Sequence, residues 1–206
     1  MNAIRLGAGD VLLVVDIQHD FIGGTLSVPG GAEVVPVLNR YLTRFAAAGQ
    51  PVIATRDWHP PDHCSFHDQG GPWPRHCVAG TPGAEFDPAL ALPRGVRIVS
   101  KATARDREAY SAFAGTDLDE ALRALGATRL FIGGLALDYC VVETTRDARR
   151  LGYDVCVLVD GVRAVDATPG DGARALAAMR DAGATAVTLA DLDAIPGGRA
   201  GSTTGA

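Results

Sequence analysis

The sequence has no long apolar run and no excess of positive charge. None of its hydrophobic stretches reaches the ~18 residues that a membrane-spanning helix needs. The apolar run near the N-terminus, residues 11–15, ends in an acid and lacks the small-residue cleavage site of a secretory signal. The formal net charge is −5, so the chain offers no bulk positive charge to neutralise phosphates. We therefore expect a cytoplasmic protein whose main partner is neither a nucleic acid nor a membrane.

Cysteine and histidine are both scarce. The chain of 206 residues is long enough to bury a core without disulfides, so its four cysteines need not be paired. Cys156 lies in an apolar run and is interpreted as a small core side chain. Of the five histidines, four fall between residues 59 and 76. This clustering predicts a local function for that segment.

Short apolar runs alternate with longer amphipathic stretches along the chain. The runs predict six strands, at residues 11–16, 51–57, 96–101, 129–134, 153–160 and 184–191. The stretches predict helices at residues 32–49, 117–127, 139–152 and 170–183. This alternation is typical of a parallel sheet covered on both faces. The expected fold class is α/β, a doubly wound, mostly parallel six-stranded sheet of Rossmann-like type. We expect one domain over residues 1–196 and a flexible C-terminal tail over residues 197–206.

Chemically active side chains follow four successive predicted strands. Asp16, Asp57 and Lys101 end the first three strands, and Cys140 follows the fourth at a strand-to-helix turn. Ligands of open α/β sheets bind beyond the carboxyl ends of the strands, so these side chains should meet at one edge. Taken alone, each residue can have a purely structural role, as a turn-capping acid, a solvated lysine or a core thiol. Their convergence favours a functional site.

Cys140 is the candidate nucleophile. It begins a predicted helix, where free backbone N–H groups and the helix dipole favour a thiolate and can also face a developing oxyanion. Asp16 can accept the thiol proton and later give it to a leaving amine. Lys101 can hold the negative charge of Asp16 and Cys140 and so position both.

The candidate metal ligands lie in residues 56–66 and 73–78, at the border of and within residues 58–95, a Pro-, Gly- and His-rich segment that is long enough to suggest function. Asp57 and His59 are two residues apart, so in extended chain they point to the same side. Two prolines between His59 and His63 disfavour a shared helical face, and His76 returns from across the loop. One Asp with two or three His suits zinc, iron or manganese. The alternative is a hydrogen-bonded surface loop.

Longer motifs around these residues resemble the nicotinamidase family of the isochorismatase-like hydrolase superfamily. The motifs are DIQHDF (16–21), RDWHPPDHCSF (56–66), GGPWPRHC (70–77), GTPGAEF (80–86), KATARDREAYSAF (101–113) and GLALDYCVVETTRDA (134–148). The resemblance covers nearly the whole chain and implies the doubly wound fold already expected. It also implies hydrolysis of nicotinamide to nicotinate and ammonia through a cysteine thioester, as in NAD salvage, with pyrazinamide as a further substrate.

The resemblance implies roles for the residues at the sheet edge. Asp16, Lys101 and Cys140 correspond to the catalytic triad. The backbone N–H groups of Ala136 and Cys140 would hold the oxyanion, beside a cis peptide expected between Leu135 and Ala136.

The resemblance further implies a metal and a substrate pocket. One divalent ion per chain (zinc, iron or manganese) would be bound by Asp57, His59 and His76 and would meet the pyridine nitrogen. His63 is a ligand in some relatives and a water-linked neighbour in others, so its role is left open. The residues expected around the substrate are Phe21, Trp73, Tyr110, Leu135 and Ala136, with Phe21 and Trp73 flanking the ring.

Several alternatives remain at this stage. Leu137 stands where the family often has Thr, which bears on substrate preference rather than on the reaction class. The enzyme alternative is a cysteine hydrolase of the same superfamily that acts on another small amide or a carbamoyl compound. A non-catalytic binding module is disfavoured because the whole triad is present. A dinucleotide-binding protein is disfavoured because no GxGxxG follows the first strand. A homo-oligomer is left open.

Overall fold

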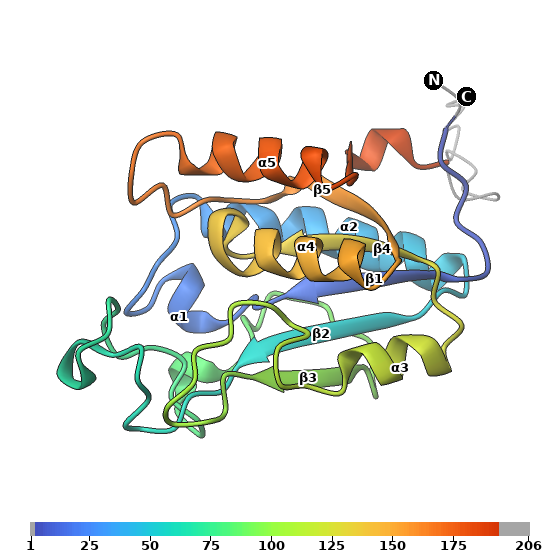
Figure 1. Ribbon diagram of the computed structural model, residues 1–206. Coiled ribbons are helices and arrows are strands. Elements are labelled where there is room, and N and C mark those ends of the chain that lie inside the picture. Colours follow the sequence, from blue (N-terminus) through green and yellow to red (C-terminus); the bar gives the residue numbers. More distant parts are fainter. Residues whose placement is uncertain (1–2, 194–206) are drawn as a thin grey trace, which may run out of the picture.

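The computed structural model describes residues 3–193 and places six strands in one sheet (Figure 1). They are β1 (Asp10–Val15), β2 (Val52–Asp57), β3 (Arg97–Lys101), β4 (Arg129–Gly134), β5 (Asp154–Val162) and β6 (Thr185–Val187). The strand order is β3-β2-β1-β4-β5-β6, and all neighbouring pairs are parallel. The chain thus winds outward from β1 to one side and then from β4 to the other. This confirms the doubly wound fold.

Helices cover both faces of the sheet (Figure 1). They are α1 (His19–Ile22), α2 (Val34–Ala47), α3 (Leu118–Ala124), α4 (Val142–Arg150) and α5 (Asp171–Asp181). All six residues of β1 are buried, because successive side chains point to opposite faces and both faces are covered. Leu13 packs in the cluster that includes side chains of α3, α4 and α5. Its neighbours Leu12 and Val14 pack in the cluster formed with α1 and α2.

Three elements differ from the sequence-based expectation. The helix expected from residue 139 begins with a turn of π-helix, Leu137–Val141, and α4 starts only at Val142. The last strand ends at Val187, where the chain turns into Leu189–Asp191 with a capping box between Thr188 and Asp191. The one-turn helix α1 was not predicted, because four residues are too few for a helical apolar pattern.

Two expectations concern the ends and the environment of the chain. The tail expected over residues 197–206 lies outside the described residues. Across residues 3–193, the structure contains no helix with the length and apolar character required to cross a membrane.

Close contact between β1 and β4 sets the direction of the chain towards Cys140. Gly134 has φ +133°, and a Cβ atom at this position would lie 2.0 Å from the carbonyl oxygen of Val15. Only glycine fits such an approach of two backbones. The chain therefore leaves β4 tightly against β1 before it turns into the segment that carries Cys140.

The long segment between β2 and β3 folds at the carboxyl ends of these strands (Figure 1). It contains two short 3-10 turns, His67–Gln69 and Pro82–Ala84. Isolated bridges join His59 to Val78 and Phe66 to Trp73. The segment is irregular, but these bridges hold its parts together and place its histidines near the carboxyl ends of the strands.

Candidate active site

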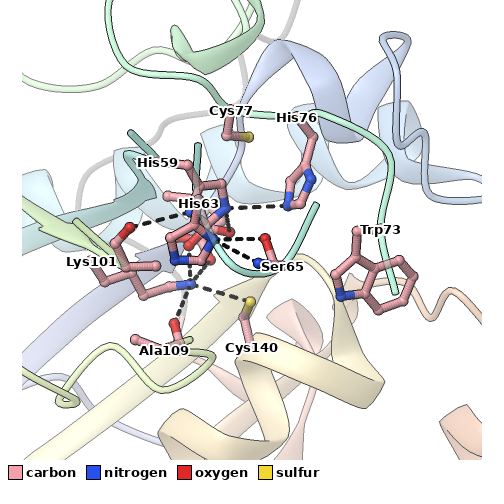
Figure 2. A network of polar contacts seen from close by, with 12 residues as sticks. His59, His63, Ser65, Trp73, His76, Cys77, Lys101, Ala109 and Cys140 are labelled. Carbon is pink, nitrogen blue, oxygen red and sulfur yellow. Dashed lines mark hydrogen bonds and ion pairs between the residues drawn. The ribbon is translucent and has the colours of Figure 1, made fainter. Parts of the chain in front are cut away.

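Four predicted side chains meet where β1, β2, β3 and β4 end. Asp16 follows β1 with φ 49°, and Asp57 and Lys101 are the last residues of β2 and β3. Cys140 lies in the π-turn that follows β4. All four are buried, with at most 5% of each residue exposed. Neighbouring parallel strands therefore bring the acids, the lysine and the thiol together at their carboxyl ends, as expected, and Figure 2 shows Lys101 beside Cys140.

Lys101 is the centre of this group. Its Nζ lies 3.0 Å from Asp16 Oδ2 and 2.5 Å from Asp57 Oδ1. The same nitrogen donates to the carbonyl oxygen of Ala109 at 3.2 Å and to Cys140 Sγ at 3.3 Å. Burial alone would lower the pKa of Lys101, but the carboxylates of Asp16 and Asp57 outweigh it, so the pKa lies well above its ordinary value. The lysine is therefore a fixed cation and not a proton donor near neutral pH.

The two carboxylate oxygens of Asp16 have different partners. Thr55 donates its hydroxyl to Oδ1 at 2.6 Å, whereas Oδ2 faces Lys101 and accepts no other hydrogen bond within the described residues. Burial, and next the charge of Asp57, raise the pKa of Asp16, and Lys101 and Thr55 oppose that rise. A raised carboxylate pKa makes Asp16 a stronger base than an exposed aspartate.

The thiol of Cys140 is protonated at rest. Burial raises its pKa well above the ordinary value, and the charge of Lys101 only partly offsets this effect. Desolvation in this buried position therefore opposes the thiolate that the helix start was expected to favour. A base is needed to activate the sulfur, and Asp16 is adjacent.

The turn that holds Cys140 is closed by a π-helical hydrogen bond. The carbonyl of Ala136 accepts hydrogen bonds from the N–H groups of Tyr139 at 3.2 Å and Val141 at 3.0 Å. The peptide bond before Ala136 is cis, as the resemblance implied. The backbone N–H groups of Ala136 and Cys140, expected to form an oxyanion hole, belong to this one short segment.

Asp57, His59 and His76 converge on one point and fit a metal ion. Their ligand atoms all lie within 4.8 Å of one another. The Nδ1 atoms of His59 and His76 lie 3.2 and 2.8 Å from the carbonyl oxygens of Ala102 and Pro74. A carbonyl only accepts, so each Nδ1 carries the proton and each Nε2 presents a lone pair. These two lone pairs face each other across 3.2 Å, an arrangement that a bound cation would stabilise.

Electrostatics also suit this ligand set. Burial lowers the pKa of His59 to about 4, so its ring is neutral at neutral pH. Burial would raise the pKa of Asp57, but Lys101 and His59 outweigh it and the pKa lies below its ordinary value. A neutral imidazole and an ionised carboxylate are the forms that bind divalent metals.

His63 lies beside the cluster but does not point into it. Its ring stacks on that of His59, with centroids 4.2 Å apart. One ring nitrogen lies 2.7 Å from the Ser65 hydroxyl and the other 3.1 Å from the Arg107 carbonyl oxygen. In this structure His63 supports the ring of His59 and is not part of the convergent ligand set (Figure 2).

A pocket opens between the candidate metal ligands Asp57 and His76 and the thiol of Cys140. The indole nitrogen of Trp73 donates to the Tyr110 hydroxyl at 3.0 Å, which links the segment after β2 to the segment after β3. The ring of Tyr139 meets Trp73 edge-on, with centroids 5.0 Å apart. The lining includes Phe21, Trp73, His76, Tyr110, Ala136, Tyr139 and Cys140.

Leu135 is the one expected pocket residue that the structure places elsewhere. Its side chain is fully buried in the core on the α2 face and contributes nothing to the lining. Its backbone still continues the pairing with β1 just after β4, because its N–H donates to the carbonyl oxygen of Val15.

Sequence reasoning missed several residues that hold the site together. The Gln18 side chain accepts from the N–H of Asp57 and donates to its carbonyl, both at 2.8 Å. Thr55 orients Asp16, as described above. Tyr139 and Glu108 line the pocket. Gln18 and Tyr139 lie within the motifs already recognised, so their position was a usable signal.

A family model described as the isochorismatase domain matches residues 10–191. Among curated proteins, the nicotinamidase of Escherichia coli (strain K12) is 40% identical over 208 residues, with coverage of 90% of this chain and 98% of the relative.

Two solved structures are similar in sequence and in fold. The pyrazinamidase of Pyrococcus horikoshii in complex with zinc has a TM-score of 0.84 and 47% identity, covering 88% of this chain and 99% of that one. PnC1 from L. infantum in complex with nicotinate also has a TM-score of 0.84, at 34% identity, covering 93% and 98%.

Proposed function

The chain belongs to the isochorismatase domain family, and on that premise we propose that it is a nicotinamidase that hydrolyses nicotinamide to nicotinate and ammonia. Its likeness to two curated nicotinamidases, over 90% and 75% of this chain, supports this activity. The observation that carries the proposal is the contact of one buried lysine with Asp16, Asp57 and Cys140. Pyrazinamide, an aromatic amide of the same shape, is a second substrate.

The first half of the reaction forms a thioester. Cys140 Sγ attacks the carboxamide carbon while its proton passes to Asp16, whose Oδ2 is the oxygen that Thr55 leaves free. The N–H groups of Ala136 and Cys140 hold the negative charge on the carbonyl oxygen. When the C–N bond breaks, Asp16 returns the proton to the nitrogen and ammonia leaves.

The second half releases the acid. Water attacks the thioester and gives a proton to Asp16. The bond between the acyl carbon and Sγ then breaks, Asp16 passes that proton to the sulfur, and nicotinic acid leaves and ionises to nicotinate. Lys101 remains charged throughout, because its pKa lies well above the ordinary value. Its fixed charge stabilises whichever of Asp16 and Cys140 is anionic at each stage.

The pocket orients the ring for this attack. Phe21 and Trp73 line it together with Tyr110, and aromatic side chains offer broad stacking surfaces to a pyridine. Asp57, His59 and His76 would hold one divalent ion of zinc, iron or manganese, which supplies a Lewis acid for the ring nitrogen and can lower the pKa of bound water. We propose a divalent ion at this site without choosing among these three metals.

An ammonia-release assay on nicotinamide, with and without a chelator, tests the proposed activity. We expect ammonia and nicotinate in equal amounts from the untreated protein, loss of activity after chelation, and recovery when a divalent metal is returned. Absence of ammonia from the metal-loaded protein, with release from a carbamoyl compound instead, would overturn the proposal.

A further inference from the structure

Asp20 is a buried carboxylate without a cationic partner. Only 7% of the residue is exposed, and no Lys, Arg or His of residues 3–193 forms an ion pair with it. Oδ2 accepts the N–H of Cys77 at 2.8 Å, and Oδ1 accepts the N–H of Thr25 at 3.1 Å. Burying a carboxyl group is costly unless its oxygens are hydrogen-bonded, and these two backbone N–H groups provide those bonds.

Two glycines leave room for this carboxylate. A Cβ atom at Gly83 would lie 2.1 Å from Asp20 Oδ2, and a Cβ at Gly24 would lie 2.3 Å from Oδ1. Neither glycine has a positive φ, so close approach, and not backbone conformation, excludes a side chain at both positions. Chain segments on both sides are thus built around the oxygens of Asp20.

The two bonded segments carry parts of the candidate site. Asp20 precedes the pocket residue Phe21, and Cys77 follows the metal-ligand candidate His76. Phe21 and His76 have ring centroids 5.7 Å apart. Cys77 adopts φ 45°, an unfavourable conformation for a residue with a side chain, and its N–H is the group that Asp20 holds. Figure 2 shows His76 directed inward from this segment.

A second bond reinforces the same connection. The Thr25 hydroxyl donates to the carbonyl oxygen of Arg75 at 2.7 Å. The chain around α1 therefore bonds to residues 75–77 twice, through Thr25 and through Asp20. The Nδ1 of His76 is in turn fixed by the Pro74 carbonyl. The ring of His76 is therefore oriented by a short segment whose own position depends on Asp20.

We propose that Asp20 is a positioning residue, which fixes His76 for metal binding and keeps Phe21 beside it, although Asp20 touches neither metal nor substrate. This inference rests on the metal site of the proposed function. Groups that orient metal ligands typically change metal affinity by about 10–100-fold when they are altered. Loss of the Asp20 carboxylate should have an effect of that size.

The test is a titration of the metal-free full-length protein with Co²⁺, followed by its visible absorption bands. Asp20→Asn keeps the shape but loses one acceptor oxygen, and we expect the dissociation constant for Co²⁺ to rise about 10–100-fold. Activity should return at saturating Co²⁺, since the catalytic residues are untouched. Unchanged Co²⁺ affinity in a folded Asp20→Asn variant would overturn the proposal.

Asp160→Asn is the matched control. Asp160 also joins two segments, because it accepts the Tyr41 hydroxyl at 2.8 Å and the N–H of Leu189 at 3.0 Å, and it does not line the pocket. A comparable loss of thermal stability with unchanged Co²⁺ affinity is expected. An equal fall in affinity for both variants would mean that general loosening of the fold explains the effect, and would contradict a specific role of Asp20.

A second variant keeps the test decisive if Asp20→Asn does not fold. Gly83→Ala retains the carboxylate but pushes a methyl group into it, and we expect weaker Co²⁺ binding again. Parent-like affinity in Gly83→Ala would then overturn the role of Asp20. If the parent itself bound no Co²⁺, the metal site would fail and this role with it, whereas a parent that binds Co²⁺ but releases no ammonia would contradict the amidase activity alone.

Discussion

At the scale of single residues, the site depends on buried charges that compensate one another. Lys101, Asp16 and Asp57 are almost completely buried, and none would be stable there alone. Together they place one cation between two carboxylates beside the thiol of Cys140. The same lysine thus connects the nucleophile to the metal-ligand cluster, so the two halves of the site are electrostatically coupled.

Replacing Cys140 by Ala should abolish hydrolysis. Loss of a covalent nucleophile typically costs several powers of ten in rate, so activity below about 1% of the parent is expected. Cys156→Ala is the control, because Cys156 is also buried but packs in the core on the α2 face. Ammonia release and circular dichroism of both variants check this. Retention of more than about 1% activity in a folded Cys140→Ala protein would exclude the nucleophile.

Replacing Thr55 by Val should shift the acid limb of kcat/KM to higher pH. The Thr55 hydroxyl favours the ionised form of Asp16, so its removal raises a pKa that burial has already raised. Protonated Asp16 cannot accept the thiol proton, so activity is lost as the pH falls through that pKa. A hydrogen bond to a charged group contributes about 1.5–3 kcal/mol, which corresponds to roughly tenfold or more at acidic pH.

Thr55→Ser provides the matched control for this profile, since it keeps the hydroxyl. We expect Thr55→Ser to follow the parent closely across the pH range. A Thr55→Val profile that superimposes on both would show that Thr55 does not tune Asp16.

At the scale of elements, the regular parts were predictable and the irregular parts were not. The alternation of apolar runs and helices fixed the sheet, because burial on both faces leaves a clear pattern in β1. The rule that parallel strands end at one edge then brought Asp16, Lys101 and Cys140 together. By contrast, α1 and the π-turn before α4 were missed, since single turns set by tertiary hydrogen bonds carry no periodic signal.

The same reason explains the supporting residues that escaped prediction. Gln18, Asp20 and Thr55 each bond to a group at least 39 residues away along the chain, and such long-range partners cannot be inferred from spacing. The direction of the Leu135 side chain was missed because it depends on how β4 joins the turn.

The junction of β4 and β1 should tolerate no side chain at Gly134. Gly134→Ala would place a Cβ atom 2.0 Å from the Val15 carbonyl oxygen at a φ of +133°, at a cost of about 3 kcal/mol. We expect Tm to fall by roughly 5–10 °C, as measured by calorimetry. In Gly7→Ala, where a Cβ meets nothing within 4 Å, Tm should be unchanged. Equal Tm values for both variants would refute the steric account.

At the scale of the whole molecule, the fold brings two kinds of chemistry to one pocket. The carboxyl ends of the strands supply Asp16, Lys101 and Cys140, and the long segment after β2 supplies His59 and His76. Trp73 and Tyr110 link that segment to the one after β3 across the pocket. In the proposed reaction, an ion held by Asp57, His59 and His76 would orient an aromatic amide by its ring nitrogen while Cys140 attacks its carbonyl carbon.

Specificity constants for nicotinamide, pyrazinamide and benzamide test this claim most directly. All three rings can stack on Phe21 and Trp73, so stacking should discriminate little. Nicotinamide and pyrazinamide each present a ring nitrogen meta to the carbon that bears the amide, whereas benzamide has none. Misplacement of the carboxamide can cost on the order of 100-fold, so we expect kcat/KM for benzamide to be lower by about that factor. Benzamide hydrolysis as fast as that of nicotinamide would contradict the account.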